Sequence, residues 1–119
     1  MRSNIASAAL GLLAYAAPGY AYWRMSCPGR VATERIDPIV APGQVSAHVH
    51  TVSGGNALNF SMDYADTQTS ECSSCPIKQD LSNYWTPKLY YMHENGSFED
   101  VPQAGDGVGA VGGMTVYYL

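Results

Sequence analysis

The chain has few charged residues, and cations are the scarcest of them. Charged residues make up 13% of the 119 residues, and six Lys and Arg are set against ten Asp and Glu. Proteins that bind nucleic acids neutralise phosphates with Lys and Arg, so this composition argues against a nucleic-acid partner. No apolar run reaches the roughly 20 residues that a membrane-spanning helix needs. We therefore expect no membrane span in the mature chain.

Several catalytic signatures are also missing. The chain has no GxxxxGK[ST] loop for nucleotides, no His-Glu-x-x-His helix for zinc proteases and no Gly-x-Ser-x-Gly elbow for serine hydrolases. Residues 51–55, which follow a His-x-His pair, contain no acid, although a cupin metal site needs a Glu there. These absences exclude the commonest motif-defined enzymes and leave a chemistry built on histidines, carboxylates and aromatic rings.

The N-terminus has the pattern of a secretory signal peptide. Arg2 is the only charged residue before Arg24, and an apolar run of Ala and Leu covers residues 6–17. Small residues around Ala21 give a cleavage site, with Ala17 as an alternative. We expect residues 1–21 to be removed and residues 22–119 to be secreted as part of a single domain.

Two sequons agree with export. Asn59-Phe60-Ser61 and Asn95-Gly96-Ser97 both match the N-glycosylation pattern, and the second also has the composition of an exposed turn. We therefore predict glycans at Asn59 and Asn95.

The cysteine count is odd. In a secreted chain Cys27, Cys72 and Cys75 are expected to be oxidised, and the Cys72-Ser73-Ser74-Cys75 spacing then favours a structural disulfide over a redox or zinc site. The sequence leaves open which of the two pairs with Cys27. The chain also ends inside an apolar, β-like run at 114–119. These two features predict a truncated chain, with a further cysteine partner beyond Leu119.

Composition predicts a mainly β, antiparallel, loop-rich domain of the sandwich or jelly-roll kind. Tyr is abundant at 9 copies, and 12 Gly and 7 Pro interrupt the apolar segments. The expected strands cover residues 22–25, 31–36, 45–52, 78–91 and 98–101. A type II turn is expected at 41–44, a helical turn at 64–69 and a hairpin turn at 93–97.

The His48-x-His50 pair is the sharpest candidate for chemistry. On a strand over 45–52 both imidazoles point to one face, with Cα atoms about 6.5–7 Å apart. They would then bind a divalent metal such as copper or zinc, with Asp37 or Asp80 as third ligand. Alternatively one imidazole acts as a general base that Asp37 orients, or both are structural and hydrogen-bonded to backbone.

A second candidate region runs from Asp80 to Tyr91. Asn83, Trp85 and Lys88 are expected to border a cleft, and exposed aromatic rings there stack on sugars. The alternative is that these aromatic residues are core.

The residues also resemble a known family. Trp23-Arg24-Met25-x-Cys27, Arg35-Ile36-Asp37-Pro38-Ile39-Val40-x-Pro42-Gly43, Ser46-x-His48-x-His50, Gly55-Asn56, Cys72 and Asp80-Leu81-Ser82-x-Tyr84-Trp85-x-Pro87-x-Leu89-Tyr90 occur in this order. Together they are similar to the secreted fungal and bacterial family DUF1996, whose members are longer and often adjoin carbohydrate-binding modules. The resemblance implies a site formed by Asp37, His48, His50, Asn56, Asp80 and Trp85.

These observations predict a secreted domain that acts on or binds extracellular polysaccharide. The expected catalytic residues are Asp37, His48, His50 and Asp80, and the expected substrate-binding residues are Asn56, Tyr84, Trp85 and Lys88. One alternative is a non-enzymatic module that binds carbohydrate or a host surface. The other is a truncated product without function.

Overall fold

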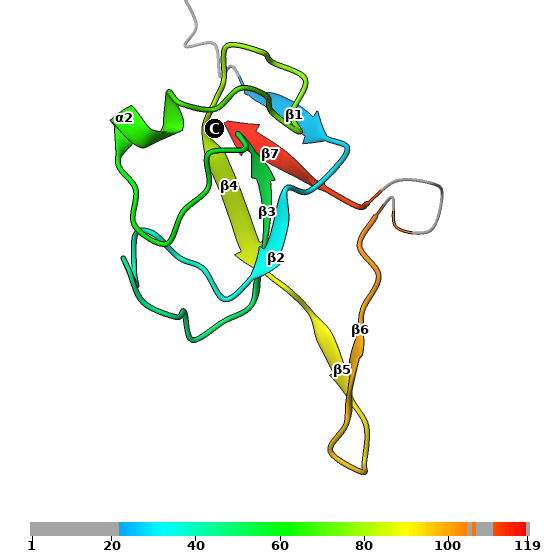
Figure 1. The fold of residues 1–119 in the computed structure, drawn as a ribbon. Helices are drawn as coiled ribbons and strands as arrows, with labels where there is room; N and C mark the ends of the chain where they lie inside the picture. The colour runs from blue at the N-terminus through cyan, green and yellow to red at the C-terminus, as the bar shows by residue number, and fades with distance from the viewer. Residues whose placement is uncertain (1–21, 105, 107–110, 119) are drawn as a thin grey trace, which may run out of the picture.

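The computed structural model describes residues 22–104, 106 and 111–118. The predicted signal peptide at 1–21 lies outside the described residues. The described chain is mostly strand and loop, and every strand pair is antiparallel, which confirms the prediction of a mainly β, antiparallel domain. The strands form a two-stranded, a three-stranded and another two-stranded sheet (Figure 1).

The three-stranded sheet is the centre of the molecule. It consists of β2 (Ala32–Glu34), β3 (His50–Gly54) and β4 (Asn83–Pro87), with β3 in the middle. All five residues of β3 are buried, because β2 and β4 cover both of its edges and loops cover its faces. Its Thr-Val-Ser sequence suits this position, since small and β-branched side chains pack well on a pleated surface.

A second sheet joins the two ends of the described chain. β1 (Trp23–Cys27) pairs with β7 (Met114–Tyr118) along its whole length, from Trp23 opposite Tyr118 to Cys27 opposite Met114. The Trp23 and Tyr118 rings stack with centroids 4.4 Å apart. The apolar run at the end of the sequence is therefore a strand with a partner inside the chain.

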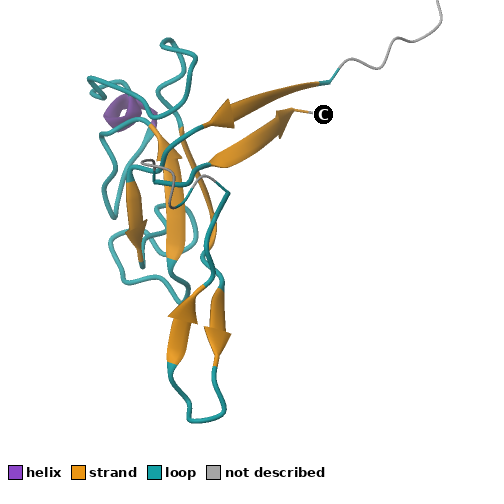
Figure 2. Ribbon diagram, turned by 90° about the vertical axis from the view of Figure 1, so that its right-hand side faces the viewer, coloured by secondary structure: helices purple, strands orange, loops and turns teal. Residues whose placement is uncertain are grey.

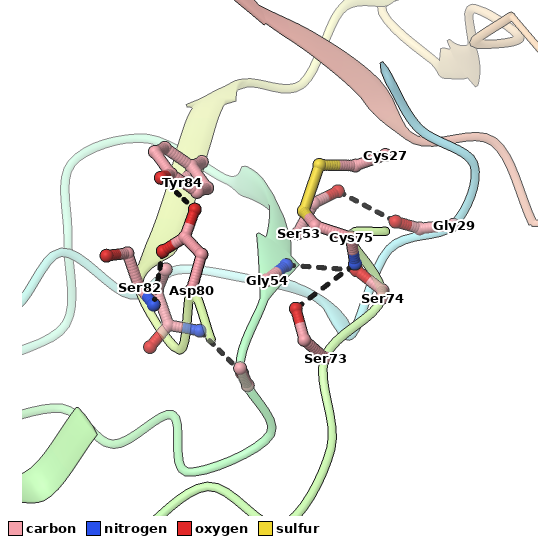
Figure 3. The surroundings of a disulfide bond; sticks show 12 residues. Cys27, Gly29, Ser53, Gly54, Ser73, Ser74, Cys75, Asp80, Ser82 and Tyr84 are labelled. Carbon is pink, nitrogen blue, oxygen red and sulfur yellow. Dashed lines mark hydrogen bonds between the residues drawn. A yellow bond between two sulfur atoms is a disulfide. The ribbon is translucent and has the colours of Figure 1, made fainter. Parts of the chain in front are cut away.

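A disulfide and a small apolar cluster connect these two sheets. Cys27 of β1 is bonded to Cys75, 48 residues later (Figure 3). Cys72 is a free, exposed cysteine. Buried Met25 packs beside this bond, and the partly buried residues around the cluster are Ile77, Tyr84, Met114 and Val116. The structure thus resolves the pairing that the sequence left open.

The third sheet is a hairpin that projects from the body of the molecule (Figure 2). It pairs β5 (Tyr90–Met92) with β6 (Phe98–Asp100), and the predicted turn at 93–97 is confirmed by hydrogen bonds between His93 and both Gly96 and Ser97. One continuous strand was expected over 78–91. The chain instead ends β4 at Pro87 and begins the hairpin at Tyr90, because a proline cannot donate to a strand ladder.

Lys88 lies at the root of this hairpin. Its side chain is only 2% exposed, and its ammonium donates to the carbonyl oxygen of Val101 at 2.9 Å and lies 3.8 Å from the Asp100 carboxylate. The prediction that Lys88 borders a binding cleft is therefore replaced by a structural role, in which it holds the two arms of the hairpin together.

Two local predictions agree with the structure. The helical turn is α2 (Tyr64–Thr67), which begins with a capping box in which Asp63 and Asp66 each accept a hydrogen bond from the other's backbone N–H. The Gln44 N–H donates to the Ala41 carbonyl, and Gly43 has a φ of 68°, as a type II turn requires. In the described part of the chain, no helix is long and apolar enough to cross a membrane.

The strand expected over 45–52 is wrong in its first half. β3 begins at His50, and the preceding residues form a loop. Arg35 explains the difference, because its carbonyl oxygen accepts the Ser46 N–H at 3.0 Å and its guanidinium donates to the Ser46 carbonyl oxygen at 2.8 Å. The Ser46 hydroxyl then accepts the His48 N–H, so local hydrogen bonds replace the sheet ladder.

Candidate functional site

β4 presents its two aromatic residues to opposite faces of the central sheet. Trp85 lies opposite Val52, and Tyr84 lies opposite Ser53. Because cross-strand partners share a face and the side-chain period is two, Trp85 shares its face with His50, whereas Tyr84 points toward β1 and β7. The expected aromatic wall of Tyr84 and Trp85 is therefore split between two separate environments.

His50 is the better placed of the two predicted histidines. It is buried, and its Nδ1 lies 2.7 Å from the carbonyl oxygen of Ile36. A carbonyl oxygen can only accept, so Nδ1 carries the proton and the lone pair of neutral His50 is on Nε2. This arrangement orients the ring as a general base or metal ligand requires, although His50 does not line the cavity described below.

His48 does not join His50 on a strand. It is exposed in the loop before β3, and the two rings are tilted with centroids 5.9 Å apart. Within residues 22–104, 106 and 111–118, no three His, Cys, Asp or Glu side chains are grouped as a metal ion would need. The described donors therefore do not supply the three-ligand copper or zinc site considered from the sequence.

Asp37 stabilises the turn that leads into the His loop. One of its carboxylate oxygens accepts the backbone N–H groups of Val40 at 2.9 Å and Ile39 at 3.1 Å. These bonds, that of Val40 first, lower the pKa of Asp37, with smaller contributions from the charge of His50 and from the Trp85 side chain, against an opposing effect of burial. Asp37, His50 and Trp85 thus lie close together.

Acid is expected to destabilise the fold through Asp37. Its pKa is below the usual value of 3.8, so the ionised carboxylate contributes stability above about pH 5, and this contribution is lost as the pH falls through the lowered pKa. Urea midpoints at pH 7, 5 and 3 should fall less steeply for Asp37→Asn than for the wild type, because Asn keeps the acceptor oxygen but does not titrate. Equal slopes would contradict this assignment.

Asp80 belongs to a different cluster on the opposite face. Its carboxylate accepts the Tyr84 hydroxyl at 2.6 Å (Figure 3). The Tyr84 hydroxyl is also hydrogen-bonded to that of Tyr118. Burial raises the pKa of Asp80, but bonds from Tyr84 and Ser82 outweigh it and the net pKa is lowered. Burial and Asp80 together raise the pKa of Tyr84. Tyr84 therefore links Asp80 and β4 to Tyr118 of β7, and Asp80 makes no hydrogen bond to Asp37 or the histidines.

A cavity of about 310 Å³ lies beside Trp85. It is enclosed by the segment after Asp37, by α2 and by the start of β4, and its volume is at the lower end of ligand sites. Residues that line it include Ile39, Met62, Asp63, Tyr64, Asn83 and Trp85. A larger cavity of about 500 Å³ lies between β4 and β7, but no charged residue lines it.

Asn83 lies in the wall of the smaller cavity. Its amide nitrogen donates to the Gly55 carbonyl at 2.6 Å, whereas Oδ1 is, among the described residues, a buried acceptor without a partner. Such an atom costs roughly 1–3 kcal/mol. The sequence placed Asn83 and Trp85 at a cleft, but it missed Tyr64 and Asp63, for which the capping-box spacing before α2 was the available signal.

The other predicted residues are dispersed. Asn56 accepts the N–H groups of Glu71 and Cys72, so it organises the cysteine loop. Asn59 and Asn95 are both exposed, as glycosylation requires, but occupancy of the sequons stays a prediction. The structure thus brings Asp37, His50 and Trp85 together, whereas Asn56, Asp80, Tyr84 and Lys88 hold other parts of the fold.

Comparison with known protein families gives a match. The family model described as a domain of unknown function, DUF1996, matches residues 37–119. No curated protein and no solved structure matches the chain. The matched segment holds Asp37, both histidines of the His-x-His pair and the whole cavity beside Trp85. Because the model covers well over half of the sequence, the chain belongs to the DUF1996 family.

Proposed function

We propose that this domain binds extracellular carbohydrate in the cavity beside Trp85. The observation that carries the proposal is the convergence of two aromatic side chains, Tyr64 and Trp85, with the polar residues Asp63 and Asn83 around one small cavity. Aromatic faces stack on the apolar faces of sugar rings, and a few polar groups then fix the orientation.

Two further features support an extracellular binding role. The Cys27–Cys75 disulfide is typical of proteins in oxidising compartments, which agrees with the predicted signal peptide. Asn83 lines the cavity and has a buried Oδ1 that finds no hydrogen-bond partner among the described residues, and such groups persist where function rather than stability selects the residue. His50 supports the site indirectly. It contacts the Ile36 carbonyl and Asp37, which directly precede the cavity-lining residues Pro38 and Ile39.

Tyr64→Ala is the variant that tests the proposal. Tyr64 is 78% exposed, so its removal should leave the fold intact, but it should weaken oligosaccharide binding about tenfold by removing a stacking surface. A glycan array would identify ligands, and isothermal titration calorimetry would compare wild type and variant.

Tyr91→Ala is the matched control. Tyr91 is 59% exposed on the projecting hairpin, remote from the cavity residues, and its loss should leave affinity unchanged. Equal weakening by both variants, or none by Tyr64→Ala, would show that sugars bind elsewhere. The absence of any bound glycan on the array would overturn the proposed function itself.

A further inference from the structure

The charges around the cavity point to one class of sugar. We infer that the site takes a cationic amino sugar, such as a polymer of glucosamine with free amines, in preference to a neutral or acidic glycan. This inference rests on the proposed function and names its ligand.

The cavity has negative charge and no matching cation. Asp63 is its charged lining residue, and no Lys or Arg is among the residues that line it. Asp37 directly precedes Pro38, which also lines the cavity. An anionic sugar would therefore meet like charge, whereas an ammonium group would be attracted.

The cations that neighbour this part of the chain already have partners. Lys88 is buried with Val101 and Asp100 at the root of the hairpin. The guanidinium of Arg35 donates to the Ser46 carbonyl. These groups are held by their own contacts, so they do not compete for the acidic cavity.

One carboxylate oxygen of Asp63 can accept a hydrogen bond from a ligand. Its Oδ1 accepts the N–H of Asp66 at 3.1 Å as the N-cap of α2, and its own N–H donates to the Asp66 carboxylate at 2.8 Å. None of the hydrogen bonds among the described residues uses Oδ2 of Asp63. This exposed oxygen is available to an ammonium group, and a charge-assisted bond is the stronger kind of hydrogen bond.

The neighbouring side chains favour the same ligand. Tyr64 follows Asp63 directly, and its exposed ring forms part of the cavity wall with Trp85 and Ile39. An ammonium group beside an aromatic face gains a cation–π interaction, while the apolar face of the sugar packs on the rings. A neutral sugar would use only the second of these contacts.

The Asp63→Asn variant tests the charge of Asp63 separately from its role as the N-cap of α2. Asn is as good an N-cap as Asp, so α2 should be retained, but the negative charge is lost. By calorimetry at pH 6, wild type should bind a glucosamine tetramer at least tenfold more tightly than tetramers of N-acetylglucosamine or glucose. Asp63→Asn should abolish this preference and leave the neutral tetramers unaffected. Glu94→Gln at the hairpin tip makes the same charge change away from the cavity and should have no effect.

The outcomes distinguish this inference from the proposed function. If neutral tetramers bind as tightly as the glucosamine tetramer, the inference is overturned while carbohydrate binding stands. The same holds if the preference survives in Asp63→Asn. If no tetramer binds and an oligolysine peptide does, the cavity recognises cations of another class, and both the inference and the proposed function fail. Loss of the preference only in Asp63→Asn supports the inference.

Discussion

Replacement of Cys27 by Ser is expected to lower the free energy of unfolding by about 4 kcal/mol. The Cys27–Cys75 bond closes a loop over a sequence separation of 48 residues, and chain-entropy estimates for a loop of this size are close to that value. Domains of this size are stable by only about 5–15 kcal/mol, so the loss would bring the chain near its unfolding threshold. The apolar cluster of Met25 and Cys75 around the bond would also be loosened.

Urea unfolding followed by tryptophan fluorescence would measure this effect. Cys72→Ser is the matched control, because Cys72 is free and exposed and its replacement should change stability by less than about 0.5 kcal/mol. Peptide mapping should find the 27–75 bond in wild type and in Cys72→Ser. If Cys72→Ser proved as destabilising as Cys27→Ser, Cys72 would have a covalent role that the structure does not assign to it.

Gly54→Ala is expected to cost about 3–5 kcal/mol, the sum of backbone strain and overpacking. Gly54 ends β3 with a φ of 116°, a conformation that L side chains rarely adopt. A Cβ atom there would lie 1.9 Å from the backbone oxygen of Ser82. No side-chain rotation can relieve a clash with backbone, so β3 and β4 would have to separate beside Asn83, at the edge of the proposed binding cavity.

Gly43→Ala provides the comparison for Gly54→Ala. Gly43 also has a positive φ, 68°, but nothing lies within 4 Å of a Cβ atom at that position. Only the backbone strain remains, which costs about 1–2 kcal/mol. Thermal unfolding of both variants should therefore show a clearly larger drop for Gly54→Ala. Equal decreases in Tm for the two variants would mean that the backbone near Ser82 moves to accommodate a Cβ atom at little cost.

Local features of the fold could be predicted from the sequence. The hairpin turn at His93–Ser97, the turn at Gly43 and the helical turn at Tyr64 all depend on residues close in sequence, whose φ preferences and capping groups are readable directly. The two end strands were recognised by their apolar runs, but their mutual pairing was not. That pairing depends on contacts across nearly the whole chain, for which a single sequence has no local signal.

The candidate site was predicted only in part for the same reason. Asp37, His50 and Trp85 are named as site residues from the sequence, and the structure places both His50 and Trp85 beside Asp37. His48 lies in a loop and not on the expected strand, because Arg35 is hydrogen-bonded to Ser46. Residue types alone do not reveal this contact. The prediction that Tyr84 and Trp85 both bind substrate in one site neglected the two-residue period of side chains along a strand. This period puts adjacent residues on opposite faces, and it could be read from the sequence.

The pairing of β1 with β7 also sets an order of events during synthesis. β1 leaves the ribosome well before β7, because Cys27 lies opposite Met114, which is 87 residues (114 minus 27) further along the chain. At about 5–20 residues per second, β1 waits on the order of 5–20 seconds for β7. Cys75 is synthesised well before Met114, so an oxidising compartment can fix β1 covalently to the central sheet before the closing strand exists. The disulfide thus anchors β1 during the interval before β7 has been synthesised and can pair with it.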